Sequence, residues 1–398
     1  MIEKRLSDIT LSDIRSLIDN EVGEKKTLEY KRELHLDTAE ARKEFLADVT
    51  SLANADGGDL IYGIEEDGGT NLPTALPGIP IENEDKLILQ LEGMLQNGVS
   101  PRIPSVLFKV LPLKKGTGVL LLRMDRSYSA PHRVTHSGHD RFYTRNAKGK
   151  YPMDVEELRT AFIRSQGVEL KMEEYKLRRL EDIREDRYRF FSEGAPKLVL
   201  QLLPVAAFAT NNLYSVSQIQ QAAGPPRPGE ETKITLEGLI RIDRTAEEDR
   251  ATGYRQFYKK GMMEQVAKKA FYRSANGPDP QVVHLIHRAI VATTLINFLE
   301  MARQYYRRLE LHSPVVVSCA IVGGNGYTLD GEDGSYSSKQ LADAIDRELL
   351  PLPDTYWDDP DGLTIDGMQW ALDGLWNACG YPRCPFYDAD GRWIFSRG

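Results

Sequence analysis

The chain has 398 residues, of which 41% are hydrophobic and 28% are charged, the composition of a soluble globular protein long enough for two domains. No apolar run approaches the roughly 20 residues needed to span a bilayer, and residues 1–18 lack the apolar core of a signal peptide, so we expect a cytoplasmic protein without a membrane partner. Three cysteines exclude a disulfide framework, and Cys379 and Cys384 have no histidine or second cysteine pair nearby, so we expect no zinc.

The net charge of -8 is distributed unevenly along the chain. Residues 1–100 carry 10 basic and 21 acidic side chains, a balance of -11, whereas residues 101–150 carry 11 basic and 2 acidic side chains, a balance of +9. A protein with this asymmetry can bind a polyanion such as nucleic acid on one face although its average charge is acidic. Two differently charged solvated surfaces would give the same numbers, so the choice depends on the motifs.

The first hundred residues alternate between helix and strand patterns. Thr38 is expected to cap the clearest helix at its N-terminus, and Gly57 and Gly58 are expected to end it. From periodicity and turn residues, the predicted elements are a helix at 9–20, a strand at 27–33, a helix at 38–55, a strand at 59–64, a turn at 65–69 and a helix at 82–97.

The remaining pattern predicts that the first module closes and a second domain follows. The expected elements are strands at 106–113 and 118–125, a closing helix at 154–166, strands at 194–208 and 233–243, a long helix at 283–309 and a buried strand at 314–324. We therefore predict an α+β fold in three parts. A mixed sheet with packed helices covers 1–165, a charged connecting helix covers 166–194, and an α+β domain of unknown role covers 195–398.

Several common ligand sites are not supported by the sequence. There is no GxxxxGK[ST] loop, so we do not expect ATP binding, and GGNGYTLDG at 323–331 is interpreted as a loop because it has no lysine and opens no helix. His132, His136 and His139 lie in one segment at spacings of 4 and 3, which suits a metal. Apart from Asp140 they have no acidic or cysteine neighbour, so we favour a solvated or phosphate-facing loop.

Acidic residues around the first strand form the strongest candidate site. Glu24 stands just before that strand and Glu29 within it, while Glu66 and Asp67 follow the next strand. If the two strands lie side by side, these carboxylates meet at one sheet end and could hold a hard divalent cation, Mg²⁺ or Mn²⁺, which polarises phosphate. Lys31, on the strand face of Glu29, could stabilise developing negative charge. The alternative is a set of solvated charges at a strand end and an acidic turn.

The order of these motifs resembles the AlbA_2 module of the Schlafen family. The resemblance rests on E-x4-E-Y-K from Glu24, a helix ending in LANADGG, a strand ending in IYGIEED and a late FYTRNAKGKYPM, and it covers roughly 15–165. It implies that Glu24, Glu29 and Glu66 are the three acidic residues of a nuclease, with Asp67 as the alternative third ligand. The family usually has aspartate at the third position, so Glu66 is a departure. Zinc-binding members use His and Cys, whereas this module has no cysteine.

A basic segment fits binding to a phosphate backbone. Cations contact phosphates, and an aromatic ring can stack on an exposed base. The candidate nucleic-acid-binding residues are Lys114, Lys115, Arg141, Arg145, Lys148, Lys150 and Tyr143. Phe142 and Tyr151, which lie among them, are more typical of core anchors.

Together these features lead us to expect a metal-dependent endoribonuclease acting on tRNA or other structured RNA, in a defence or stress role implied by the family. The resemblance also implies a homodimer, because eukaryotic members join two such lobes and this chain has one. Two alternatives stay open. The module could bind DNA or RNA as a regulator or sensor without cutting it, or the chain could be an assembly protein whose apolar C-terminal strands make the interaction.

Overall fold

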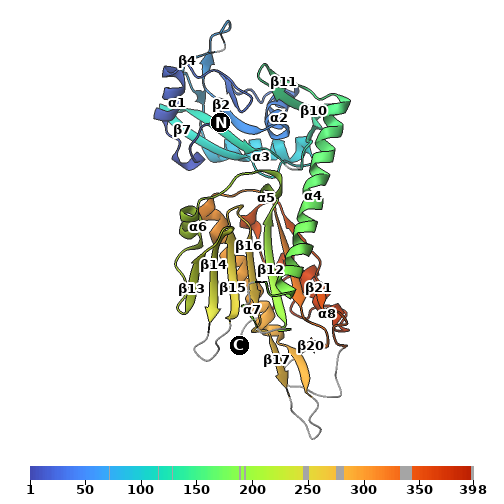
Figure 1. Ribbon diagram of the computed structural model, residues 1–398. Coiled ribbons are helices and arrows are strands. Elements are labelled where there is room, and N and C mark those ends of the chain that lie inside the picture. The colour runs from blue at the N-terminus through green and yellow to red at the C-terminus, as the bar shows by residue number, and fades with distance from the viewer. Residues whose placement is uncertain are drawn as a thin grey trace. The chain divides into compact units, whose positions relative to one another are not determined.

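The computed structural model describes residues 1–70, 72–114, 116–127, 129–187, 190–191, 194–244, 251–274, 282–331 and 343–395. The chain forms two compact units, Met1–Val168 and Glu169–Gly398 (Figure 1). Each unit combines helices with sheets, so the fold is α+β, as predicted from the sequence. Within the described residues, every helix is too short or too polar to cross a membrane.

The centre of the first unit is a five-stranded mixed sheet. β1 (Leu28–Lys31) runs parallel to β2 (Gly57–Tyr62), with Glu29 opposite Leu60 in the register. β2 pairs antiparallel with β8 (Thr117–Asp125). The parallel pair confirms that the two strands carrying the candidate carboxylates lie side by side.

Shorter strands complete the sheets of this unit. β8 also pairs with β5 and β7, a second sheet has the order β11-β10-β9-β6, and β3 pairs with β4. These strands are β3 (Glu65–Glu66), β4 (Pro73–Ala75), β5 (Ile79–Pro80), β6 (Val99–Ser100), β7 (Leu107–Lys114), β9 (Arg133–Val134), β10 (Arg141–Asn146) and β11 (Gly149–Pro152).

Side-chain caps set where the main helices of the first unit begin. The Thr38 hydroxyl accepts a hydrogen bond from the Ala41 amide at 3.1 Å, which confirms the predicted cap, and Asn83 accepts from the Lys86 amide at 2.8 Å. The helices are η1 (Leu6–Asp8), α1 (Leu11–Asp19), α2 (Ala39–Asn54), α3 (Glu84–Gly98), η2 (His136–Gly138) and the first half of α4 (Val155–Arg184).

Both faces of the central sheet are buried. On one face, Tyr62 and Leu120 pack with Phe45 and Leu46 of α2. On the other face, Ile61 packs in the cluster that holds Leu28, Tyr30, Ile9 and Ile14. Successive strand residues point to opposite faces, so β2 and β8 read as nearly continuous apolar runs. This packing fixes β1 and β2 beneath the candidate site.

Gly58 lets the chain turn from α2 into β2. Its φ is +152°, and a Cβ added there would lie 2.5 Å from the Thr27 carbonyl oxygen. We therefore expect Gly58→Ala to lower the free energy of unfolding of the first unit by at least about 2 kcal/mol. Gly93→Ala is the matched control, because its Cβ would meet nothing within 4 Å and alanine favours a helix by about 1 kcal/mol. Hydrogen exchange of peptides from residues 1–168 measures the stability of both variants. Equal protection of these peptides from exchange in Gly58→Ala and Gly93→Ala would contradict the expectation.

The second unit is built on an eight-stranded antiparallel sheet of order β13-β14-β15-β16-β12-β19-β21, with β22 also paired to β19. A three-stranded sheet, β17-β18-β20, accompanies it. The strands are β12 (Lys197–Pro204), β13 (Glu230–Ile234), β14 (Gly238–Arg244), β15 (Ala251–Tyr258), β16 (Met263–Ala267), β17 (Phe271–Ser274), β18 (Val283–Ile286), β19 (Val315–Val322), β20 (Tyr327–Leu329), β21 (Leu349–Pro351) and β22 (Thr355–Trp357).

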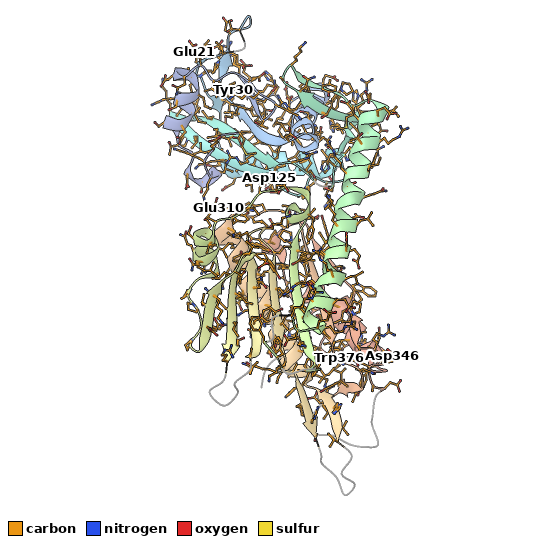
Figure 2. All side chains as sticks on the ribbon, in the orientation of Figure 1. Glu21, Tyr30, Asp125, Glu310, Asp346 and Trp376 are labelled. Atoms are coloured by element: carbon orange, nitrogen blue, oxygen red, sulfur yellow. The ribbon has the colours of Figure 1, made fainter. Side chains whose placement is uncertain are left out.

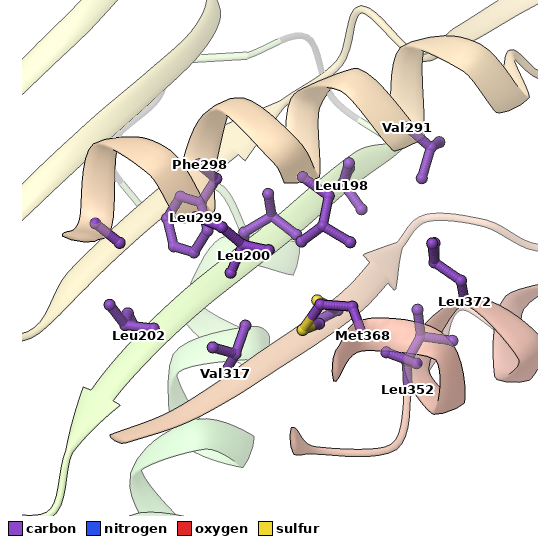
Figure 3. Packing of buried hydrophobic residues seen from close by; sticks show 14 of the residues in the cluster. Leu198, Leu200, Leu202, Val291, Phe298, Leu299, Val317, Leu352, Met368 and Leu372 are labelled. Carbon is purple, nitrogen blue, oxygen red and sulfur yellow. The ribbon is translucent and has the colours of Figure 1, made fainter. Parts of the chain in front are cut away.

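Alternate residues of β12 serve different cores in this unit. Leu198 and Leu200 face the large core, where they pack near Phe298 of α7 (Figure 3), while Val199 joins the cluster that contains Leu180 of α4. The helices, besides the second half of α4, are α5 (Ala206–Ala209), α6 (Val216–Ala223), α7 (Arg288–Leu309), η3 (Pro360–Gly362), η4 (Asp366–Met368) and α8 (Gln369–Ala378).

The structure differs from the sequence prediction at several elements: β3 lies within the predicted turn at 65–69, and the strand predicted at 194–208 ends at Pro204 and is followed by α5. The closing helix and the charged connecting segment at 166–194 are not separate, because α4 runs without a break from Val155 to Arg184. The strand predicted at 233–243 is a hairpin, since Gly238, with φ of +152°, starts a second strand. The helix predicted from 283 begins only at Arg288, after β18.

Candidate functional site

A tight turn explains why two glutamates five residues apart lie together. The Lys25 and Leu28 backbones exchange two hydrogen bonds of 3.0 Å, which folds the chain back just before β1. Glu24 is thereby carried alongside the strand, where its Oε1 accepts a hydrogen bond from the Tyr30 amide at 2.9 Å. The Tyr30 ring, labelled in Figure 2, is buried in the core and its hydroxyl donates to the Val22 carbonyl at 2.8 Å.

The third glutamate reaches the same place from the end of β2. The amide of Gly63 donates to the Lys31 carbonyl at 2.7 Å, which ties the chain after β2 to the end of β1 and delivers Glu66 on β3. Burial, with the nearby charges of Glu24 and Glu29, raises the pKa of Glu66 to about 7. Burial and Glu29 also raise the pKa of Glu24. Glu24, Glu29 and Glu66, called the carboxylate cluster, therefore lie close enough for their charges to interact.

Glu29 is the member of the cluster that is neutralised. Its Oε1 lies 2.5 Å from Lys31 Nζ, and its Oε2 accepts from Arg145 Nη2. Although burial works to raise the pKa of Glu29, the charges of Lys31 and Arg145 outweigh it and lower that pKa. Burial lowers the pKa of Lys31, but Asp48 and Glu29 outweigh this effect and raise it. Lys31 is therefore positively charged beside the cluster.

Among the described residues Glu66 has no ion-pair partner, and the charge of Lys31 only partly offsets the rise in its pKa. Its Oε1 is buried and makes no hydrogen bond to the described residues. A buried acceptor without a donor costs free energy, and like charges nearby add to that cost. An arrangement of this kind is retained where it serves a ligand or a reaction more than the fold.

A second charge pair behind Glu29 was not foreseen from the sequence. Asp48 of α2 is 2% exposed, and its carboxylate lies 2.6 Å from Lys150 Nζ, which also contacts Glu44. Burial raises the pKa of Asp48, against the pull of Lys150 and Lys31. The sequence does contain an indication that Asp48 is buried, because this residue lies on the same apolar face of α2 as Phe45 and Leu52.

The oxygen donors of the cluster are of the type that Mg²⁺ and Mn²⁺ prefer. As positioned, however, both oxygens of Glu29 contact cations, and no three His, Cys, Asp or Glu side chains within the described residues are grouped closely enough to hold a metal ion. The residue types fit a divalent cation, and the unpartnered Glu66 oxygen fits one as well. Glu29 would have to exchange Lys31 or Arg145 for the ion.

Asp67, the alternative third ligand, lies outside this cluster. Its Oδ1 accepts hydrogen bonds from the amides of Gly69 and Thr70 at 2.9 and 3.0 Å, and these bonds lower its pKa. Asp67 is exposed and shapes the turn after β3. The geometry therefore places Glu66, and not Asp67, with Glu24 and Glu29.

The predicted nucleic-acid-binding residues divide into exposed and buried groups. Three of these residues are exposed. Arg141 begins β10, Lys148 lies in the turn between β10 and β11, and Lys114 ends β7. Lys115 lies outside the described residues. Tyr143 is only 9% exposed and belongs to the core, so it does not offer a stacking face.

Two of the predicted cations are engaged inside the protein. Arg145 is 3% exposed and pairs with Glu29, so its guanidinium faces the carboxylate cluster and not the surface. Lys150 is half-buried and its ammonium contacts Asp48 and Glu44. The prediction of a surface contact to phosphate therefore does not hold for these two residues as positioned. The alternation of β10, which points residue 145 inward with Tyr143, could have indicated this.

The three histidines of the loop after β8 have different environments and do not form one site. His132 is fully buried; its Nδ1 lies 2.7 Å from the Pro101 carbonyl oxygen, and its backbone is held by Asn54 through bonds of 2.7 and 2.9 Å. His136 and His139 are half-buried at the short helix η2. His132 is thus a core residue that anchors the loop to α2.

Burial of neutral His132 makes the first unit sensitive to acid. Burial lowers the pKa of His132 from 6.5 to about 4, so between these values the unfolded chain binds a proton that the folded chain does not. Stability from this residue is complete above pH 6.5 and is lost as the pH falls toward 4. The difference of about 2.5 pKa units corresponds to roughly 3 kcal/mol. We expect the urea concentration at which half of the first unit is unfolded to fall as the pH is lowered from 6.5 to 4. This fall should be smaller in His132→Gln and the same as in the wild type in His139→Gln.

One family of known proteins matches the part of the chain that holds this site. The family model described as Schlafen, AlbA_2 matches residues 24–154, a range that contains the whole carboxylate cluster. Among solved structures, the DIP2311 protein from Corynebacterium diphtheriae is 20% identical over 36% of this chain and 26% of that chain, with a TM-score of 0.24. The match thus spans about a quarter of that protein, and at this TM-score no common fold is inferred. No curated protein matches the chain.

Proposed function

We propose that this chain is a divalent-metal-dependent endoribonuclease, because the match of residues 24–154 to the Schlafen, AlbA_2 family model points to a nucleic-acid-related function. Its substrate would be tRNA or another structured RNA. Glu24, Glu29 and Glu66 would hold Mg²⁺ or Mn²⁺. When bound, such an ion would polarise a phosphoryl oxygen or lower the pKa of a bound water molecule. A role in defence or stress response and assembly as a homodimer belong to the same proposal, and light scattering tests the dimer.

The proposal rests on three carboxylates that lie close together and are only partly neutralised by cations. Lys31 and Arg145 neutralise Glu29, while Glu24 and Glu66 have raised pKa values and Glu66 Oε1 has no hydrogen-bond partner in the described structure. A cation would relieve this repulsion. The fold contributes rigid placement, since β1 and the turn before it are bonded to each other and to β2.

Lys31 would act on the phosphate directly. Its side chain is about one-third exposed and its ammonium lies beside Glu29, so negative charge developing on a phosphoryl oxygen could be stabilised there. In hydrolysis a water oxygen bonds to phosphorus, the bond from phosphorus to the leaving ribose oxygen breaks, and that oxygen takes up a proton. The cleaved RNA then carries a phosphate at one new end and a hydroxyl at the other.

The exposed cations near the site are expected to bind the RNA backbone. We expect Arg141→Glu with Lys148→Glu to weaken RNA binding by at least tenfold and to reduce the dependence of affinity on salt, because each phosphate contact releases counterions. Filter binding at several salt concentrations measures both effects. Lys233→Glu, at an exposed position in the second unit, is the matched control and should bind as the wild type does. Equal affinities for all three proteins would exclude this surface.

A second candidate function is nucleic-acid binding without cleavage, as a regulator or sensor. The occupation of both Glu29 oxygens by Lys31 and Arg145 favours it, because an ion pair already satisfies the central carboxylate. In that case the cluster would stabilise or shape the binding surface, and metal would not be required.

One experiment separates the two functions. The full-length protein is incubated with total tRNA in Mg²⁺, Mn²⁺ or EDTA, and the products are resolved on a denaturing gel while binding is followed by filter retention. Fragments that need metal would support the endoribonuclease. Binding that persists in EDTA with intact tRNA in every lane would support the binding function, and no binding even at low salt would contradict both.

A further inference from the structure

The second unit contains a cavity of about 320 Å³ at the N-terminal end of α7. Its main lining residues are His287, Arg288, Asp330, Pro385, Phe386 and Phe395. The volume is near the lower end of the range for small-molecule sites. Its polar residues come from the junction of β18 with α7 and from the end of β20, and its apolar ones come from the C-terminal segment.

Asp330 organises the polar side of this cavity. It is 3% exposed, and its carboxylate accepts hydrogen bonds from the Arg288 amide at 3.1 Å and the Tyr272 hydroxyl at 3.4 Å. The same carboxylate lies 3.2 Å from His287 Nδ1. The His287 Nδ1 atom is buried and makes no hydrogen bond to the described residues, while Nε2 lies on the opposite side of the ring. The His287 side chain is 41% exposed, which leaves that nitrogen accessible.

A buried arginine lies beside Asp330 on the polar side of the cavity. Arg288 is only 7% exposed and lines the cavity, with its Nε 3.4 Å from Asp330. The first turn of the 22-residue helix α7 adds its backbone N–H groups, and Ala289 of that turn also lines the cavity. A buried guanidinium next to a helix N-terminus is suited to an anionic group.

The opposite wall is aromatic. The rings of Phe386 and Phe395 lie 4.2 Å apart with an interplanar angle of 33°, and the edge of Phe386 also packs against Trp376. Because Trp376 is 1% exposed, the aromatic wall is anchored in the core. A planar ring of a ligand could stack on such a surface.

We propose that this cavity binds a small molecule that combines one anionic group with a planar ring, of the size of a mononucleotide. The anion would lie against Arg288 and the first turn of α7, His287 Nε2 would make a hydrogen bond, and the ring would pack on Phe386 and Phe395. The site is independent of the carboxylate cluster, so it does not depend on RNA cleavage. It would give the second unit a ligand of its own.

Isothermal titration of the full-length protein tests the site, with AMP as the probe and inorganic phosphate and adenosine as its two parts. We expect AMP to bind, and each part alone to bind at least about tenfold more weakly, because phosphate lacks the ring that would stack and adenosine lacks the charge that would pair with Arg288. Benzoate in place of AMP distinguishes a carboxylate ligand from a phosphate ligand; binding by either supports the proposal.

Variants locate the binding. Arg288→Met should weaken AMP binding at least tenfold, and His287→Gln, at a more exposed position, should weaken it several-fold with an unchanged melting temperature. His284→Gln is the matched control, because His284 stacks on Tyr327 at 4.9 Å and does not line the cavity. The proposal is overturned if AMP and benzoate both fail to bind, if adenosine binds as tightly as AMP, or if His287→Gln binds AMP like the wild type.

Discussion

Glu66→Gln is expected to lower RNA cleavage at least a hundredfold without reducing the stability of the first unit. Glutamine keeps the size of the side chain and removes the charge that would bind a cation or act on phosphate. The carboxylate is half-buried beside two other glutamates, and its Oε1 has no hydrogen-bond partner in the described structure. Its removal therefore takes away repulsion and breaks no ion pair.

The pH dependence follows from the same arrangement. Burial, Glu24 and Glu29 raise the pKa of Glu66 from 4.5 to about 7, so the folded protein holds this proton more tightly than the unfolded chain. Stability from this residue is therefore complete below pH 4.5 and declines as the pH rises through 7. We expect the decline between pH 5 and pH 8, measured by hydrogen exchange of peptides from residues 1–168, to be smaller in Glu66→Gln.

Glu65→Gln is the matched control for this prediction. Glu65 is the adjacent residue, but its carboxylate pairs with Arg32 at 2.8 Å on the surface, where ion pairs contribute little. It should cut tRNA like the wild type. If Glu66→Gln keeps full cleavage, the carboxylate cluster is not the active site; if it loses both cleavage and stability, the cluster is mainly structural.

The part of the site that is local in sequence could be predicted. The strand predicted at 27–33 is β1, and its alternation separates Glu29 and Lys31 from Leu28 and Tyr30, which pack in a core cluster. The cap at Thr38 and the glycines after α2 likewise follow from local chemistry. These features depend on neighbours within a few residues, so one sequence contains enough information for them.

The partners of the site could not be predicted in the same way. Arg145 is 116 residues from Glu29 along the chain, and Lys150 is 102 residues from Asp48. Their charges suited an exposed phosphate-binding surface equally well. The alternation of β10 suggests that residue 145 points inward, but nothing local in the sequence names Glu29 as its partner. Burial in the sheet, a tertiary effect, decided between surface cation and internal ion pair.

A comparable internal pair determines the largest stability effect that we expect in the second unit. Glu264 is 1% exposed and accepts hydrogen bonds from Arg179 Nη2 at 2.8 Å, the Tyr254 hydroxyl at 2.9 Å and Gln201 Nε2 at 3.0 Å. Glu264→Leu should lower the free energy of unfolding by about 3–5 kcal/mol, because Arg179 then stays buried without this counter-charge. Asp182 Oδ2 lies 4.0 Å from Arg179 Nη1, a longer ion pair that would offset only part of this loss.

A second substitution distinguishes the loss of a charge partner from the loss of packing. Glu264→Leu combined with Arg179→Met removes both charges, and the double variant should recover at least half of the lost stability, since apolar groups can replace a buried ion pair. All four tryptophans lie in the second unit, so tryptophan fluorescence in urea follows its unfolding. Glu231→Ala, which breaks an exposed pair with Arg244, is the control and should not move the midpoint. A double variant less stable than the single one would mean that α4 is held at Arg179 by its other contacts, with the pair to Glu264 secondary.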